Sequence, residues 1–142
     1  MNMKEFRELF PSFKGATPAK KKKLANKAKS DADKAKEAAA TKRFILLCER
    51  FDIPTPQTQV RLVKGRKLTW DFYWEHNGVR LSLELQGAIF VRGGHSTGTG
   101  LQRDYEKVNL CVANGIYPML CSYKMLFSVG TINTIKKVLK IS

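Results

Sequence analysis

The stretch LTWDFYWEHNGVRLSLELQG, residues 68–87, decides the fold because it has the pattern of a β-hairpin. Its Asn77-Gly78 dipeptide favours a type I′ turn, in which both central residues adopt φ > 0, and predicts strands over 68–76 and 79–85. A two-residue turn fixes the register, so Asp71 on the first strand lies opposite Glu84 on the second. Like charges that oppose each other directly destabilise a strand pair. These two acids therefore require a specific explanation.

The same register gives the hairpin an apolar face and a polar face, because successive strand side chains point to opposite sides. The face predicted to pack in a core carries Trp70, Phe72, Trp74 and His76 opposite Leu85, Leu83, Leu81 and Val79. The face predicted to be polar carries Thr69, Asp71, Tyr73 and Glu75 opposite Gln86, Glu84, Ser82 and Arg80.

Four explanations of the acid pair remain open from the residues alone. One carboxyl could stay protonated, or a nearby Lys or Arg could neutralise the pair. A divalent cation could bind between the carboxylates, because Mg²⁺ favours one or two carboxylates together with water and phosphate oxygens. The acids could also splay apart on a solvated surface. A strongly basic chain that holds an acid pair on a rigid hairpin favours metal-assisted phosphodiester hydrolysis.

The charge balance points to a polyanionic partner. Lys and Arg number 26 and Asp and Glu 12, which gives the 142 residues a formal net charge of +14. Nucleic acid is the first expectation, followed by an anionic membrane surface and a ribosome-like assembly. No apolar run approaches the ~20 residues that span a bilayer, and the N-terminus MNMKEFRELF lacks a signal-peptide core. We therefore expect a soluble, cytoplasmic protein without a membrane partner.

The first part of the chain differs in composition from the rest. Residues 1–40 are rich in Lys and Ala and predict a basic helical arm, although this composition leaves a partly disordered arm open. The helix is expected from about residue 19 to Phe51, with a kink near Ser30-Asp31, and residues 41–142 are expected to form the globular domain. The predicted phosphate contacts of the arm are Lys20, Lys21, Lys22, Lys23 and Lys27.

The remaining segments predict the element order α, βββ, α, β, α. A strand is expected over 57–64, and the Gly-rich stretch GAIFVRGGHSTGTG, residues 87–100, is expected to be a loop. A helix is predicted over 101–114, with an apolar stripe that consists of Leu101, Tyr105, Val108 and Val112. A short buried strand near a sheet edge is predicted over 116–123. The last helix is predicted over 131–140, with its inward side made by Ile132, Ile135, Val138 and Leu139.

The order of these elements and acids resembles the PD-(D/E)XK nuclease superfamily. The residues that carry the resemblance are Glu49 on the first helix, Asp71 on one strand and Glu84-Leu85-Gln86 on the next. The section WDFYWEHNGVRLSLELQGAIFVRGGHSTGTGLQRDYEKVN, residues 70–109, is similar to small phage-type nucleases related to very-short-patch-repair and restriction-like endonucleases. The resemblance covers about residues 41–140. It implies an α/β (α+β mixed) fold with an αβββαβ restriction-endonuclease-like core, in which helices flank a central mixed sheet.

The resemblance also implies Mg²⁺-dependent cleavage of DNA, with Mn²⁺ as a substitute ion. Asp71 matches the first metal-binding acid, Glu84 the second, and Glu49 the acid that the first helix often supplies. Gln86 stands where the family most often has Lys, which leaves open the group that polarises the water. Candidates for that group are Gln86 itself, His95 in the Gly-rich loop, and Lys107 as a displaced lysine. Asp104 lies one helical turn before Lys107 on the predicted helix.

The function expected from these residues is a structure- or site-specific, Mg²⁺-dependent DNA endonuclease of phage or mobile-element type, acting in the host cytosol if phage-encoded. Arg92 and Arg103 flank the Gly-rich loop and are expected to contact the DNA backbone. The alternative is a non-catalytic DNA-binding or architectural protein on a decayed nuclease fold, which Gln86 favours. A glycosidase also uses paired acids, but the excess positive charge has no role there. A homodimer is plausible, because cleavage of both strands of a DNA duplex needs two sites and each chain has one.

Overall fold

The computed structural model describes residues 4, 8, 31–86 and 98–142, with side chains from residue 102 onward in the last range. By its internal contacts the chain divides into two units, Met1–Lys36 and Glu37–Ser142, and the second contains the whole sheet. The helix predicted from about residue 19 lies partly outside the described residues. Its described part is α2, Asp31–Arg50, and the predicted end near Phe51 is confirmed.

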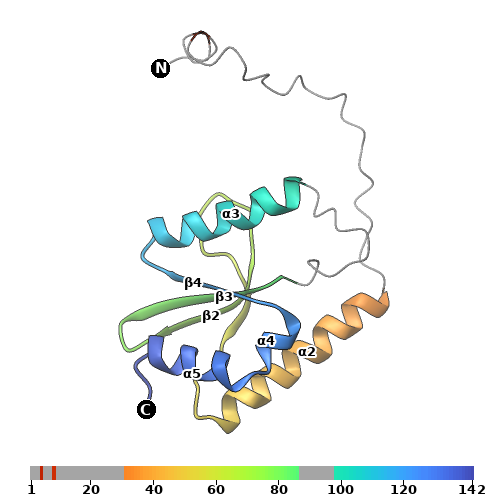
Figure 1. Ribbon diagram of the computed structural model, residues 1–142, viewed down its shortest axis with the longest axis vertical. Coiled ribbons are helices and arrows are strands. Elements are labelled where there is room, and N and C mark those ends of the chain that lie inside the picture. The colour runs from red at the N-terminus through yellow and green to blue at the C-terminus, as the bar shows by residue number, and fades with distance from the viewer. Residues whose placement is uncertain (1–3, 5–7, 9–30, 87–97) are drawn as a thin grey trace. The chain divides into compact units, whose positions relative to one another are not determined.

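Within the described residues, four strands form one sheet in the order β1-β2-β3-β4. The strands are β1 (Gln57–Val60), β2 (Trp70–His76), β3 (Val79–Leu85) and β4 (Tyr117–Cys121). The first three are antiparallel, and β4 runs parallel to β3 after the helix α3, Gly98–Ala113. A parallel neighbour needs such a crossover connection. The predicted class, a mixed α/β protein with helices on both sides of a mixed sheet, is confirmed (Figure 1).

The hairpin between β2 and β3 has the predicted register. Five opposed pairs run from Phe72 with Leu83 to His76 with Val79. Asn77 and Gly78 have φ values of 51° and 73°, as a type I′ turn requires. The turn also contacts the C-terminal end of the chain, because Asn77 Nδ2 donates hydrogen bonds to the carbonyl oxygens of Leu139 at 2.9 Å and Lys140 at 3.3 Å.

Two substitutions of Asn77 should separate its backbone role from its side-chain role. We expect Asn77→Gly to lower the free energy of unfolding by about 1 kcal/mol, because the hydrogen bonds to the last carbonyls are lost. Asn77→Ala should lower it by about 2–3 kcal/mol, because alanine also resists positive φ by roughly 1–2 kcal/mol. Urea denaturation of both variants measures the difference. Equal stability of the two variants would contradict the backbone contribution.

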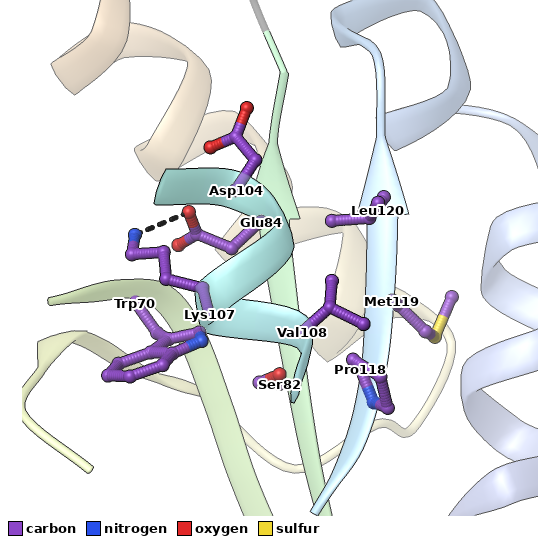
Figure 2. Close-up of a pocket in the computed structure, with 9 residues that line it drawn as sticks. All are labelled: Trp70, Ser82, Glu84, Asp104, Lys107, Val108, Pro118, Met119 and Leu120. Atoms are coloured by element: carbon purple, nitrogen blue, oxygen red, sulfur yellow. Dashed lines mark hydrogen bonds and ion pairs between the residues drawn. The ribbon is translucent and has the colours of Figure 1, made fainter. Parts of the chain in front are cut away.

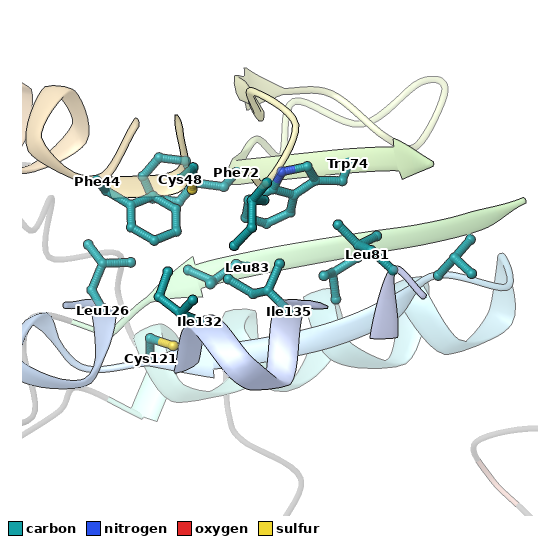
Figure 3. Packing of buried hydrophobic residues seen from close by; sticks show 13 residues of the cluster. Phe44, Cys48, Phe72, Trp74, Leu81, Leu83, Cys121, Leu126, Ile132 and Ile135 are labelled. Carbon is teal, nitrogen blue, oxygen red and sulfur yellow. The ribbon is translucent and has the colours of Figure 1, made fainter. Parts of the chain in front are cut away.

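The larger core lies on the side of the sheet that faces α2, α4 (Tyr123–Leu126) and α5 (Val129–Val138) (Figure 3). The rings of Phe44 from α2 and Phe72 from β2 meet edge to face at 4.7 Å. The predicted inward residues Ile132, Ile135 and Leu139 are buried, and Val138 packs against them. No periodicity predicts α4, because a single turn is too short to show one. The other buried members of this cluster are Cys48, Ile53, Trp74, Val79, Leu81, Leu83, Cys121 and Leu126.

A second, smaller core lies on the side that faces α3, where the sequence predicts a polar surface. Trp70, Tyr73, Cys111 and Ile116 are buried together there. The placement of Trp70 on the larger core face is therefore wrong. Strict alternation fails at Trp70 because the direct pairing of β2 with β3 starts only at Phe72, whereas Trp70 pairs with Val60 of β1.

Three further predictions need correction. The expected strand over 57–64 ends at Val60, because the chain leaves the sheet from Arg61 onward. The strand expected over 116–123 spans only β4, and although it lies at the sheet edge as predicted, Tyr117 and Leu120 are exposed. The apolar stripe of α3 is wrong at Tyr105 and Val112, which are 58% and 66% exposed, whereas Val108 lies on the inward side as predicted. No described helix is long and apolar enough to cross a membrane.

Candidate functional site

The two acids meet where the direct pairing of β2 and β3 ends. Beyond the Phe72–Leu83 pair, hydrogen bonds between side chains and backbone amides connect the two strands in place of backbone–backbone pairing. The Asp71 N–H donates to Glu84 Oε1 at 2.7 Å, and the Leu85 N–H donates to Asp71 Oδ2 at 2.8 Å. The predicted juxtaposition of Asp71 and Glu84 is thus confirmed, and each carboxylate holds a backbone amide of the opposite strand.

Lys107 brings a positive charge to this pair. Its Nζ lies 2.6 Å from Glu84 Oε2, and the side chains of Lys107 and Glu84 are only 12% and 13% exposed. The same Nζ lies 5.3 Å from the centroid of the Trp70 ring, a distance that permits a cation–π interaction. Figure 2 shows Lys107 between the Glu84 carboxylate and the indole ring. Of the explanations open from the sequence, neutralisation by a nearby lysine therefore describes this arrangement.

The rotation of α3 explains how a lysine reaches the sheet. Its side toward the sheet carries Asp104, Lys107, Val108 and Cys111, at helical spacing, while Tyr105 and Val112 face outward. A helix that turns charged side chains inward and large apolar ones outward departs from ordinary patterning. Such local conflicts are expected at functional sites.

Gln59 on β1 is a contact of Asp71 that the sequence analysis missed. Its Nε2 donates to Asp71 Oδ1 at 3.0 Å, and its Oε1 accepts from the Thr69 hydroxyl at 3.2 Å. Gln59 has a φ of 50°, a left-handed backbone conformation that a residue with a side chain rarely adopts in a strand. Backbone conformations of this kind concentrate at functional sites. The sequence predicts that β1 and β2 are neighbouring strands. It does not predict the Gln59–Asp71 contact, because the loop between the two strands leaves their pairing register undetermined.

A small pocket beside the acids is lined by residues of β2, β3, β4 and α3. Its space for water is about 10 Å³, close to the minimum for one water molecule. Asp104 lines the pocket together with Glu84 and Lys107, but forms no hydrogen bond or ion pair with any described residue. The hydroxyl of Ser82, which also lines the pocket, and the thiol of Cys111 are 3.3 Å apart and buried. Figure 2 shows Lys107 in contact with Glu84 at one end of the pocket, with Ser82 apart from this contact.

Burial raises the pKa of the Glu84 carboxyl above its ordinary value of 4.5. Loss of hydration is the largest cause, and the negative charge of Asp71 adds to it. The hydrogen bond and charge of Lys107 lower the pKa, but they do not offset the burial. The pKa of Glu84 therefore depends on the positive charge of Lys107 beside it.

The acid pair fits a divalent cation as part of its coordination shell. Each of the four carboxylate oxygens accepts one protein donor, from Gln59, Leu85, Asp71 and Lys107. A carboxylate oxygen has more than one lone pair, so these bonds leave acceptor capacity, and hard oxygen ligands suit Mg²⁺. Water or phosphate oxygens would complete the shell, because no group of three His, Cys, Asp or Glu side chains able to hold a metal occurs within residues 31–86 and 98–142.

The other predicted site residues are distributed as follows. Glu49 is exposed near the end of α2 and does not join a metal-binding group with Asp71 and Glu84. Gln86 is half-buried, and its N–H donates to the Cys121 carbonyl at 2.8 Å. Arg103 is exposed on α3. Lys20, Lys21, Lys22, Lys23, Lys27, Arg92 and His95 lie outside the described residues.

Comparison of the chain with protein-family models, with curated proteins and with solved structures finds no match. The chemistry of the site must therefore be inferred from its own side chains. These are two adjacent carboxylates, an ammonium group bonded to one of them, and a polar set of neighbours, in a chain with a net charge of +14.

Proposed function

We propose that this protein is a Mg²⁺-dependent DNA endonuclease of the PD-(D/E)XK type. The observation that carries the proposal is the contact of Lys107 with the Asp71–Glu84 pair at one end of a small pocket. Two acids and one lysine are the groups that the sequence resemblance implies for this chemistry. The strong positive charge of the chain supplies the attraction for a phosphodiester substrate.

The residues of the site have two roles, which are ion binding and charge stabilisation. Asp71 and Glu84 would hold the Mg²⁺, which when bound polarises a phosphodiester and lowers the pKa of a water molecule. Lys107 supplies the ammonium group that Gln86, at the usual lysine position, lacks. Its Nζ can stabilise negative charge as it develops on the phosphate oxygens. Gln59 orients Asp71, and the Trp70 ring orients Lys107.

The topology supports the finer fold assignment that this function requires. An antiparallel β1-β2-β3 unit is followed by α3 and by β4 parallel to β3, as expected for an αβββαβ restriction-endonuclease-like core. The acids then lie at the end of the hairpin where β2 and β3 stop pairing. A site built on strands in this way holds its side chains more precisely than a site built on loops.

A non-catalytic DNA-binding protein is the second candidate, and one observation favours it. All four carboxylate oxygens of Asp71 and Glu84 already have protein donors, and Lys107 neutralises part of their charge. An acid pair satisfied in this way can have a purely structural role. The positive charge of the chain serves both candidates equally.

Cleavage assays with the full chain separate the two candidates. Supercoiled plasmid, linear duplex, nicked and mismatched duplex, and four-way junction DNA should each be incubated with Mg²⁺, Mn²⁺ or EDTA. We expect hydrolysis of at least one of these substrates with either ion and none in EDTA, because the chemistry depends on the cation. Retarded mobility of all substrates without cleavage would contradict the endonuclease and favour the DNA-binding protein.

A further inference from the structure

We infer that the loop of residues 61–67 between β1 and β2, called the basic loop below, contacts the phosphate backbone of duplex DNA next to the acid pair. The inference rests on the proposed function and adds a binding surface to it. Arg61, Lys64, Arg66 and Lys67 are all exposed on this loop. No acidic residue occurs between Asp52 and Asp71, so the positive charge of the loop is not reduced by its sequence neighbours.

The shape of the basic loop suits an anionic ligand. Its residues surround an open hollow of about 530 Å³. The chain reverses at Gly65, which has a φ of 80°, and the Arg66 N–H donates to the Val63 carbonyl at 3.3 Å. A glycine with positive φ at the third position of a four-residue turn permits this tight reversal. The turn presents basic side chains before and after it toward the solvent.

The basic loop is attached to the domain on its inner side. Leu62, Val63 and Leu68 pack against the smaller core that contains Trp70. Arg66 forms an ion pair with Glu106 of α3. Attachment of this kind lowers the entropy lost when the loop binds a ligand. Arg61, Lys64 and Lys67 have no ion-pair partner within the described part of the chain, so their charges are available to a ligand.

Chain connectivity keeps the basic loop close to the acid pair. Lys67 precedes Asp71 by four residues, so their Cα atoms are at most about 14 Å apart. Phosphates along one DNA strand advance about 3.4 Å per nucleotide along the helix axis. The end of the loop at Lys67 therefore lies within about four phosphates of one placed at Asp71. Glu106, which holds Arg66, is also the direct neighbour of Lys107 on α3.

A charge-matched pair of variants tests the inference. The loop variant carries Arg61→Gln, Lys64→Gln and Lys67→Gln, and leaves the Arg66–Glu106 pair intact. The control variant carries Lys42→Gln, Lys124→Gln and Lys137→Gln, three exposed positions on α2, α4 and α5, which cover the other side of the sheet. Both variants lose three charges. Binding to a fluorescent duplex is measured in EDTA across a salt series, with circular dichroism to check the fold.

We expect the loop variant to bind roughly 10- to 100-fold more weakly at 0.1 M salt and the control to stay within about threefold of the wild type. The slope of log K against log salt should fall by about 2–3 for the loop variant, near 0.9 per lost phosphate contact. Equal affinity of the two variants for the duplex would overturn the inference. So would a loop variant that loses retention on phosphatidylserine vesicles while its affinity for the duplex is unchanged.

The binding experiment and the cleavage assay can fail separately. If the wild type binds DNA without cutting it and the loop variant binds weakly, the endonuclease proposal fails while the loop inference holds. If cleavage is normal and the loop variant binds like the control, the loop inference fails while the endonuclease proposal holds.

Discussion

Asp71→Asn and Glu84→Gln should each reduce Mg²⁺-dependent DNA cleavage by about 10³-fold or more, because each removes one of two anionic ligands for the cation. Binding to DNA in EDTA should stay within about threefold of the wild type, because neither acid attracts phosphate. Cleavage rates at saturating protein, together with duplex binding in EDTA, measure the two effects separately.

Glu75→Gln is the matched control for this experiment. Glu75 is an exposed acid on the same strand as Asp71, and the substitution also removes a single negative charge. It should leave the cleavage rate within about twofold, since surface substitutions away from a site have small effects. Full cleavage by both Asp71→Asn and Glu84→Gln would show that the acid pair is not the site of hydrolysis.

Lys107→Met should reduce cleavage by about 100-fold or more, because the ammonium group beside Glu84 is lost. It should also lower the free energy of unfolding by about 2–3 kcal/mol, since it leaves the largely buried Glu84 carboxylate without its ionic partner. The double variant Glu84→Gln/Lys107→Met removes both charges and should recover most of that stability. The double variant therefore tests only the structural ion pair, because Glu84→Gln alone already removes a ligand of the cation.

The Lys107→Met variant should also change the pH dependence of stability without metal. The raised pKa of Glu84 means that the folded chain holds a proton at pH values where the unfolded chain has released it. Stability therefore falls as the pH rises from 4.5 through the folded pKa. Lys107→Met removes the largest cause that lowers this pKa, so the fall should extend to higher pH. Urea denaturation in EDTA across this range measures it, with Glu84→Gln as the background in which the difference should disappear.

The sequence predicted those parts of the site that depend on local chain geometry. The Asn77-Gly78 turn determines the register of its two strands, and that register is sufficient to bring Asp71 beside Glu84. Lys107 was a candidate only as a replacement for the lysine absent at Gln86, because the predicted apolar stripe of α3 did not include it. The inference on the acid pair uses separations of a few residues, over which the period of strands remains accurate.

The errors concern contacts between segments that are distant in sequence. The apolar period of α3 selected Tyr105 and Val112 as buried, but helix rotation depends on packing against the sheet, which turns Lys107 inward. Trp70 was assigned to the wrong core because alternation does not show where β2 loses β3 as a partner. The contact of Gln59 with Asp71 depends on the register across the basic loop and on a positive φ, neither of which composition reveals.

The exchange of hydrogen bonds between Asp71 and Glu84 has a mechanical consequence. Each acid secures a main-chain amide of the facing strand, so the same oxygens serve both sheet cohesion and ligand chemistry. Whatever draws one carboxylate away also releases an amide and weakens that end of the sheet. Deuterium uptake at the amides of Asp71 and Leu85 would thus report on occupancy of the site, even in a variant that has lost all turnover.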